Sequence, residues 1–324
     1  HGDGRGSAIG WDEIEQWQPS DGVLWVHMNR GPMTSTAWLR DRSGLDSLVV
    51  QSLLEESTRP RCLQMGAGVM LFLRGVNLNP GANPEDMVSI RLWIEPTRVI
   101  SVRLRRLMSI DDLRRTIESG RGPKDVGDFI VQLAEHLTRR MADVIGDVND
   151  EVDRLQDQVL EIESGRLRTH LTRLRREIIA LRRYLAPQRD ALNRLTQLRL
   201  DWLEDQDLLH LREEADRVAR YVEDLDAARE RTAVTHEELV GRVAEQMNRT
   251  MYVLSIVAAI FLPLGLLTGL LGLIGLQQAF TLWRTRDDHH RSVDGGLHHR
   301  ACGWHRCADH PAAPDAGTGR RTGL

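Results

Sequence analysis

The feature that most constrains this chain is an uncharged run near its C-terminal end. Residues Met251 to Leu276 contain no Asp, Glu, Lys or Arg, although charged residues make up 28% of the whole chain. A helix needs about 20 predominantly apolar residues to cross the hydrocarbon core of a bilayer. The run is longer than that, so the sequence predicts one transmembrane helix over residues 251–276.

The composition of the rest of the chain excludes some classes of protein. The formal net charge of −4 at pH 7 argues against a general nucleic-acid binder, because neutralising phosphates requires a basic surplus. Three cysteines, Cys62, Cys302 and Cys307, make no disulfide framework, so the main body is expected to be cytosolic. No apolar signal region is visible near the start. We therefore expect the late hydrophobic run to direct insertion and to leave everything before it on the side of synthesis.

Residues 1–120 mix strand and helix signals and predict a cytosolic α/β domain. Gly, Pro, Asn and Asp separate four short apolar or alternating runs, at Val23–Asn29, Gly68–Leu78, Met87–Glu95 and Arg98–Arg106. The last two predict a hairpin that turns near Pro96. The segments LDSLVVQSLLEE and SIDDLRRTIESG have helical spacing, and the second is expected to begin at an N-cap Ser109 and to end at a C-cap Gly120.

Residues 121–204 predict a helical hairpin. Apolar residues recur in steps of three and four over residues 130–162 and again over residues 167–195. Pro187 lies inside the second run. A proline removes a backbone donor and clashes with the preceding turn, so we expect the second helix to kink or break there.

A third helix is predicted to begin near Asp205 and to form a stalk over residues 205–250. Neither Pro nor Gly interrupts it before Gly241, and no polar loop separates it from the hydrophobic run. The simplest interpretation is one continuous helix that enters the membrane, and separate helices in a compact bundle are the alternative. The apolar stripe of the stalk needs partners, which we expect to be helices of other subunits: Leu211, Ala215, Val218, Val222 and Leu225.

Four blocks of the sequence resemble the CorA superfamily of divalent metal ion transporters, and within it the zinc-transporter branch, ZntB. They are RPRCLQMGAGVMLFLRGVNLNPGANPEDMVSIRLWIE, LRRYLAPQRDAL, ADRVARYVEDLDAARERTAV and the most specific, the membrane-entry block EQMNRTMYVLSIVAAIFLPLGLLTGLLG. The resemblance covers Trp11 to Gly272. It implies a homopentamer in which each stalk helix becomes the pore-lining first transmembrane helix, with a short second transmembrane helix outside it.

The expected fold class is therefore α+β, with an N-terminal αβα cytosolic domain, long coiled-coil-like helices and a stalk that continues into the membrane. The resemblance implies a transporter in the bacterial inner membrane that moves divalent cations, with Zn2+ preferred and Mg2+ or another divalent ion possible. We expect no enzyme activity and no cofactor, because no catalytic constellation is visible. Two alternatives stay open: a magnesium- or cobalt-type CorA channel, and a non-transporting oligomeric scaffold anchored in the membrane.

The chain departs from the family pattern after about Gly272. In the family the first transmembrane helix ends in G-x-N, and the resemblance implies that this Asn holds a hydrated ion at the pore mouth. Here the corresponding residues are Gly272, Leu273 and Ile274, and no second apolar span follows. We interpret residues 277–324 as a frameshifted or disordered tail. The alternative is a genuine tail whose His and Cys side chains bind zinc.

One face of the predicted transmembrane helix would line a five-fold pore. At 3.6 residues per turn, and with Leu254 added by the family motif, that face holds Asn248, Met251, Leu254, Ser255, Ala258, Leu262, Gly265 and Gly269. Asn248 would present a ring of amide oxygens to a hydrated ion, and Leu262 would form an apolar constriction that gates by dewetting. The alternatives are an interfacial role for Asn248 and close helix packing for the two glycines.

No metal site is predicted outside the pore. Four histidines stand alone on charged helix faces and are expected to be solvated: His136, His170, His210 and His236. The acidic stretch Asp147–Gln158 would either attract cations into a funnel or form the solvated side of a helix.

Overall fold

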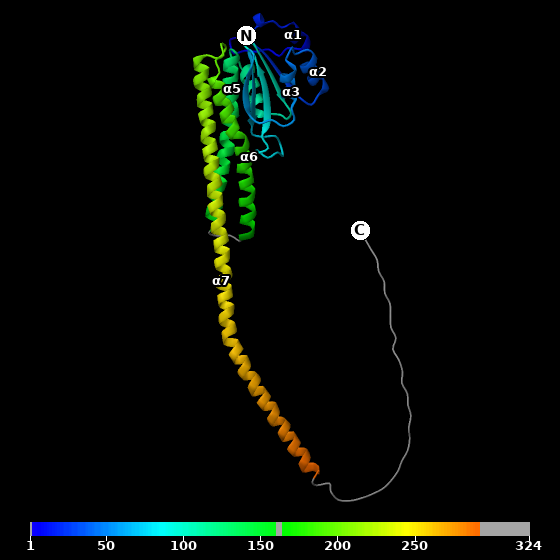
Figure 1. The fold of residues 1–324 in the computed structure, drawn as a ribbon, viewed down its shortest axis with the longest axis vertical. Helices are drawn as coiled ribbons and strands as arrows, with labels where there is room; N and C mark the ends of the chain where they lie inside the picture. The colour runs from blue at the N-terminus through cyan, green and yellow to red at the C-terminus, as the bar shows by residue number, and fades with distance from the viewer. Residues whose placement is uncertain (1, 160–163, 292–324) are drawn as a thin grey trace, which may run out of the picture. The chain divides into compact units, whose positions relative to one another are not determined.

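A computed structural model describes residues 2–159 and 164–291 (Figure 1). It divides into two compact units, His1–Asn248 and Arg249–Leu324, and each is described by itself. The first unit contains a five-stranded sheet and the long helices α5 (Val126–Gln158) and α6 (Ser164–Gln197). The last helix, α7 (Asp205–Arg291), begins in the first unit and ends in the second.

The sheet has the strand order β1-β5-β4-β3-β2, in which β1 and β5 are parallel and the other neighbours are antiparallel. Its strands are β1 (Leu24–Asn29), β2 (Arg61–Met65), β3 (Gly68–Gly75), β4 (Val88–Ile94) and β5 (Arg98–Arg103). The predicted hairpin is confirmed, because Glu95 and Arg98 close the turn between β4 and β5 with backbone hydrogen bonds in both directions. Strand β2 was not predicted, because its mostly exposed residues at the edge of the sheet carry little apolar signal.

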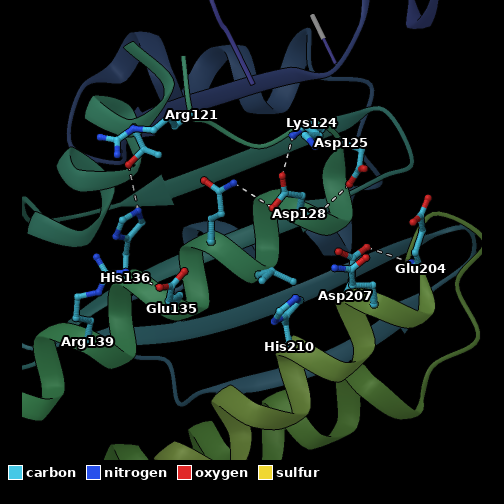
Figure 2. Close-up of a pocket in the computed structure, with 14 residues that line it drawn as sticks. Arg121, Lys124, Asp125, Asp128, Glu135, His136, Arg139, Glu204, Asp207 and His210 are labelled. Carbon is cyan, nitrogen blue, oxygen red and sulfur yellow. Dashed lines mark hydrogen bonds and ion pairs between the residues drawn. The ribbon is translucent and has the colours of Figure 1, made fainter. Parts of the chain in front are cut away.

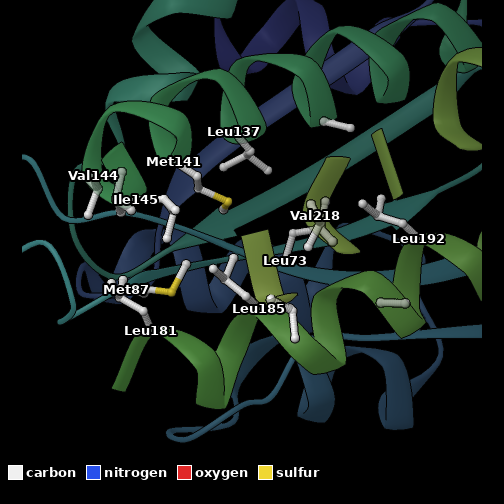
Figure 3. Close-up of a cluster of buried hydrophobic side chains, with 14 of the residues drawn as sticks. Leu73, Met87, Leu137, Met141, Val144, Ile145, Leu181, Leu185, Leu192 and Val218 are labelled. Carbon is white, nitrogen blue, oxygen red and sulfur yellow. The ribbon is translucent and has the colours of Figure 1, made fainter. Parts of the chain in front are cut away.

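Helices cover both faces of the sheet, which confirms the αβα expectation. Side chains alternate between the faces, as the period of a strand requires. Met70 and Phe72 of β3 belong to a core with α2 and α3, whereas Leu71 and Leu73 join the larger core with α4, α5, α6 and α7 (Figure 3). The shorter helical elements are α1 (Trp11–Gln16), η1 (Pro19–Asp21), α2 (Met33–Asp41), α3 (Ser47–Leu54) and α4 (Met108–Glu118).

The caps of α4 differ in part from the prediction. The N-cap is Leu107, so the expectation for Ser109 is wrong. Ser109 is buried inside the first turn, and its hydroxyl donates to the backbone oxygen of His136 on α5, 3.2 Å away. At the other end, Gly120 follows the C-cap Ser119 with φ at 75°, a left-handed conformation that glycine adopts without strain.

Helix α6 continues through Pro187 instead of breaking there. Leu185 and Leu192 lie in the core on either side of the proline. The buried Gln188 accepts a 2.7 Å hydrogen bond from the backbone N–H of Arg74 on β3. These tertiary contacts hold the helix across the proline, which costs it one backbone hydrogen bond. A break at Pro187 is therefore excluded, whereas the alternative expectation of a kink stays a prediction.

Helix α7 begins at the predicted residue and is continuous, which excludes the alternative of separate helices. It extends past the predicted membrane boundary at Leu276 to Arg291. The rest of the tail, including Cys302 and Cys307, lies outside the described residues. The first part of the tail is therefore helical, and the expectation of disorder does not hold for it.

The apolar stripe of the stalk is buried in the chain's own core. Leu211, Ala215, Val218 and Leu225 are each 0% exposed and pack in the same cluster as α5 and α6. These residues already have partners, so the prediction that this stripe joins subunits is wrong. Within the stalk, residues 205–250, the uncovered face of α7 is the opposite, polar one.

Candidate functional site

The apolar part of α7 is fully exposed in the single chain. Among the described residues, one helix is long and apolar enough to cross a membrane, and its apolar window has a mean hydropathy of 2.4 with none of it buried. Met251, Leu254 and Leu262 expose 64%, 68% and 74% of their surface. Such a surface requires lipid or other protein as its surroundings.

The Ser255 and Thr268 hydroxyl groups of this segment donate to the backbone of their own helix. Ser255 Oγ donates to the backbone oxygen of Met251 at 2.8 Å, and Thr268 Oγ1 donates to that of Leu264 at the same distance. The helix also accommodates Pro263 without ending. A helix in hydrocarbon must pair its polar groups internally, because no water is there to bond with them.

All the residues predicted to line a pore lie on α7, and those with side chains are exposed. A Cβ atom placed on Gly265, Gly269 or Gly272 would meet nothing within 4 Å. The degenerate motif Gly272, Leu273, Ile274 is helical in this chain, whereas the resemblance implied a loop at the pore mouth. Whether these residues surround a pore depends on several chains and stays a prediction.

A second candidate is a cavity of about 650 Å3 in the first unit, where the first turns of α5 and α7 meet the loop after α4 (Figure 2). The sequence patterns did not predict this cavity, because its residues come from two distant stretches of the chain, 116–139 and 204–210. Several of its acidic residues lie at helix starts and resemble ordinary helix caps in the sequence, and Asp125 is indeed the N-cap of α5. The lining is mixed in charge: Arg121, Lys124, Asp125, Asp128, Glu135, Arg139, Glu204, Asp207 and His210 are among its residues.

Hydrogen bonds already occupy the carboxylates on the acidic side of the cavity. Asp125 Oδ1 accepts from the N–H of Asp128 at 2.8 Å, and Asp128 Oδ1 accepts from the Gln132 side chain at 3.0 Å. Asp207 Oδ2 accepts from the N–H of Glu204 at 3.1 Å. Burial, together with the charges of Asp125 and Asp128, raises the pKa of Asp207 above its ordinary value. An additional negative charge, such as that of a bound anion, is therefore unfavourable on the acidic side of the cavity.

His136 is buried, contrary to the expectation of a solvated side chain. It exposes 9% of its surface, and its Nε2 lies 3.4 Å from the hydroxyl of Thr116 on α4. Burial, and after it the neighbouring Arg139, lowers its pKa. His210 lines the same cavity from α7 and is exposed, as predicted. His170 is exposed and His236 half-buried.

No arrangement of three or more His, Cys, Asp or Glu side chains in the described part of the chain could hold a metal ion. The cavity residues hold one another by caps and ion pairs, such as that between Arg139 and Glu135. The cavity therefore shows neither a metal centre nor a nucleophile with its base. The exposed segment of α7 remains the stronger functional site.

Comparison with known proteins identifies the family. The family model described as CorA-like Mg2+ transporter protein matches residues 20–273. A protein of Pseudomonas aeruginosa named divalent cation transporter CmaX is 43% identical over 277 residues, which are 84% of this chain and 83% of that protein. The zinc transport protein ZntB of Yersinia enterocolitica is 38% identical over 248 residues, 76% of each chain.

Solved structures agree with these matches. The structure of the full-length CmaX protein has a TM-score of 0.79 at 39% identity and covers 89% of this chain and 95% of its own. The complete CorA magnesium transporter of Methanocaldococcus jannaschii has a TM-score of 0.65 at 16% identity over 73% of this chain and 75% of its own, which shows a common fold. With its mixed sheet, long helices and exposed apolar α7, this chain belongs to the CorA-like Mg2+ transporter protein family.

Proposed function

We propose that this chain has the architecture of a subunit of a homopentameric channel for divalent cations, with Zn2+ as the preferred ion, and that conduction requires the family's G-x-N motif and a second span. The pore is lined by the α7 face that holds Asn248, Met251, Leu254, Ser255, Leu262, Gly265 and Gly269. The chain is inserted in the bacterial inner membrane with its first unit in the cytoplasm.

The observation that carries this proposal is the exposed apolar segment of α7 in a member of the CorA-like family. A single helix cannot conduct ions, because its backbone polar groups are bonded internally and its side chains face lipid. Several copies around an axis can enclose a path. In such a ring Asn248 offers amide oxygens to the hydrated cation, and Leu262 narrows the path with an apolar ring.

The proposal that Zn2+ is the preferred ion rests on the names of related proteins. Proteins named zinc transport protein ZntB are 35% to 38% identical to this chain, including that of Yersinia enterocolitica. The more similar relative from Pseudomonas aeruginosa is named only as a divalent cation transporter. We therefore propose that the transported ion is a divalent cation and, more specifically, Zn2+.

One observation favours a second function, a non-transporting scaffold anchored in the membrane. Gly272, Leu273 and Ile274 stand where the family has G-x-N, and Ile274 supplies no amide oxygen. The described residues also contain a single helix of spanning length. A chain of this form is able to anchor an oligomer without conducting ions.

Flux measurements separate the two functions. The test uses a variant in which G-x-N and a second apolar span replace the residues from Gly272 onward, reconstituted in liposomes that hold a zinc-sensitive dye. Saturable Zn2+ uptake is expected. Leu262→Ala is expected to raise uptake because it widens the apolar ring, whereas Ile260→Ala, on the opposite face of α7, leaves it unchanged. No uptake by the restored variant would favour the scaffold.

A further inference from the structure

The cavity in the first unit separates negative side chains from positive ones (Figure 2). Carboxylates gather around the first turns of α5 and α7: Asp125, Asp128, Glu204 and Asp207. Basic side chains lie together at the other end: Arg121, His136 and Arg139. The two ends differ in charge, and we call them the acidic end and the basic end.

Helix α5 contributes to both ends and sets the distance between them. Asp128, Gln132 and His136 line the cavity at four-residue intervals, and residues four apart lie on one side of a helix. At 1.5 Å per residue, Asp128 and His136 are about 12 Å apart along the helix axis. The two ends are therefore far enough apart to hold two separate charged groups of one molecule.

The acidic end is short of positive charge. Of the three Lys and Arg side chains that line the cavity, Lys124 alone lies beside the four carboxylates. Burial, together with the charges of Asp125 and Asp128, raises the pKa of Asp207. A cation beside Asp207 would favour its charged form. This end thus suits an ammonium group.

The basic end is short of negative charge. Arg139 is paired with Glu135, whereas Arg121 makes no ion pair within the described residues. Burial, and after it the charge of Arg139, lowers the pKa of His136. The guanidinium group of Arg121 is available to a carboxylate, which arginine binds through two parallel hydrogen bonds. This end thus suits a carboxylate group.

The middle of the cavity contains an acceptor that lacks a donor. Gln132 Nε2 donates to Asp128 Oδ1 at 3.0 Å, but Gln132 Oε1 is buried and has no hydrogen-bond partner among the described residues. A buried acceptor without a partner costs free energy. If the amide turns toward the cavity, a donor on a ligand removes that cost.

The lining restricts the kind of ligand. Val131 is the one apolar side chain among the residues that line the cavity, so a hydrophobic molecule would find little to contact. No arrangement of three or more His, Cys, Asp or Glu side chains in the described part of the chain could hold a metal ion. The volume of about 650 Å3 is typical of a site for a small molecule. The occupant is therefore a small, hydrophilic organic molecule.

We propose that this cavity binds an ω-amino carboxylate, with the ammonium group at the acidic end and the carboxylate at the basic end. The ammonium group has three N–H donors for Asp207, Glu204 and Gln132 Oε1, and the carboxylate accepts from Arg121. An extended chain of five methylene groups separates the charges by about 8 Å, and a hydrogen bond of about 2.8 Å at each end completes the span. The ligand joins α5, α7 and the loop after α4. Its binding does not depend on a pore or on the number of subunits.

Isothermal titration calorimetry of the full-length chain in neutral detergent tests the site, with 6-aminohexanoate as the probe. Two analogues of nearly the same length each lack one charge: 6-aminohexanamide lacks the carboxylate, and N-acetyl-6-aminohexanoate lacks the ammonium group. The probe is expected to bind about tenfold more tightly than either analogue, because each analogue loses a charge-assisted hydrogen bond. Glycine, whose charges are too close together to reach both ends, is expected to bind as weakly as the analogues.

Two variants test the orientation of the ligand. Arg121→Gln is expected to weaken binding of 6-aminohexanoate about tenfold without weakening 6-aminohexanamide. The double variant Glu204→Gln with Asp207→Asn is expected to weaken 6-aminohexanoate by a similar factor without weakening N-acetyl-6-aminohexanoate. In each case the analogue that keeps its affinity shows that the variant is folded.

Matched controls remove the same charges from exposed positions outside the cavity. They are Arg175→Gln and the double variant Glu223→Gln with Glu230→Gln, and both are expected to bind 6-aminohexanoate within about twofold of the unchanged chain. No measurable binding of 6-aminohexanoate, or equal affinity for the probe and its two analogues, would overturn the proposal. Equal losses in the cavity variants and the controls would also overturn it, since binding would then follow net charge alone.

Discussion

Gly127 of α5 lies directly against the Asp207 carboxylate of α7. A Cβ atom on Gly127 would sit 2.2 Å from Asp207 Oδ2 and 3.2 Å from the backbone oxygen of Trp202. The two helices begin at this contact, and only glycine leaves room for it. Because Gly127 has no side chain, the start of the stalk can pack closely against α5.

Replacing Gly127 with Ala is expected to destabilise the first unit. The new methyl group displaces the Asp207 carboxylate, and overpacking of this kind costs about 1–3 kcal/mol in the free energy of unfolding. Denaturant titration of the detergent-solubilised chain, followed by circular dichroism, measures the change.

Gly146→Ala provides the matched control on the same helix. Gly146 is exposed, and a Cβ there meets nothing within 4 Å. Since alanine favours the helix by about 1 kcal/mol over glycine, this variant is expected to be more stable. If Gly127→Ala proved as stable as Gly146→Ala, the Asp207 carboxylate would have moved aside at no cost in free energy.

The stability of the first unit is expected to fall as the pH drops from about 6.5 to about 4, because of His27. Its Nε2 accepts from Arg103 Nε at 2.8 Å, and its Nδ1 lies 2.8 Å from Ser101 Oγ. Burial, and after it the charge of Arg103, lowers its pKa to about 4. The unfolded chain binds a proton near pH 6.5 and the folded chain does not, so the loss amounts to about 2–3 kcal/mol.

Denaturation midpoints measured across this pH range test the role of His27. His27→Asn removes the titrating group and is expected to flatten the pH dependence, although the variant is less stable at pH 7. His210→Asn removes a histidine outside this network and is expected to keep the dependence. An unchanged slope in His27→Asn would contradict the prediction.

Glu214 is expected to destabilise the folded stalk when it ionises. Its side chain is 6% exposed, it contacts α5, and its Oε2 has no hydrogen-bond partner among the described residues. Burial raises its pKa. The folded chain thus holds this proton more tightly than the unfolded chain, and stability is lost as the pH rises from the ordinary glutamate value through the raised one.

Glu214→Gln keeps the shape of the side chain and removes the charge. It is expected to stabilise the chain at pH 7 and to have little effect near pH 4, where the carboxyl group is protonated in both states. Glu213→Gln, an exposed neighbour, is expected to change stability by less than about 0.5 kcal/mol at either pH. A loss of stability in Glu214→Gln at pH 7 would indicate that the contact with Arg217 outweighs burial.

The chain as it stands is expected to carry little or no Zn2+ in proteoliposomes. With Ile274 in the position of the family's Asn, an arriving hydrated ion meets hydrocarbon instead of amide oxygens, and dehydration without replacement ligands is costly. Restoring G-x-N together with a second span is expected to recover uptake. Robust, saturable uptake by the unaltered chain would contradict this prediction and would make the first helix sufficient.

Local patterns in the sequence were enough to predict most of the elements. An uncharged run as long as 251–276 is stable as a helix inside a membrane, and short apolar runs bounded by turn residues, such as β4 and β5, are typical of strands. The start of α7 at Asp205, its continuity and the hairpin near Pro96 followed from the same signals. The edge strand β2 could not be predicted from these signals, because its exposed residues show no periodic apolar pattern.

Only the tertiary structure decided what covers each apolar face. Periodicity marked the stripe from Leu211 to Leu225 as buried, but the same pattern serves a contact within a chain and a contact between chains. The fold covers this stripe with α5 and α6. Likewise His136 is buried and α6 passes through Pro187, because packing against distant segments outweighs local preference. The sequence by itself determined which faces avoid water, and the fold determined what each one meets, because partners distant in the chain leave no local trace.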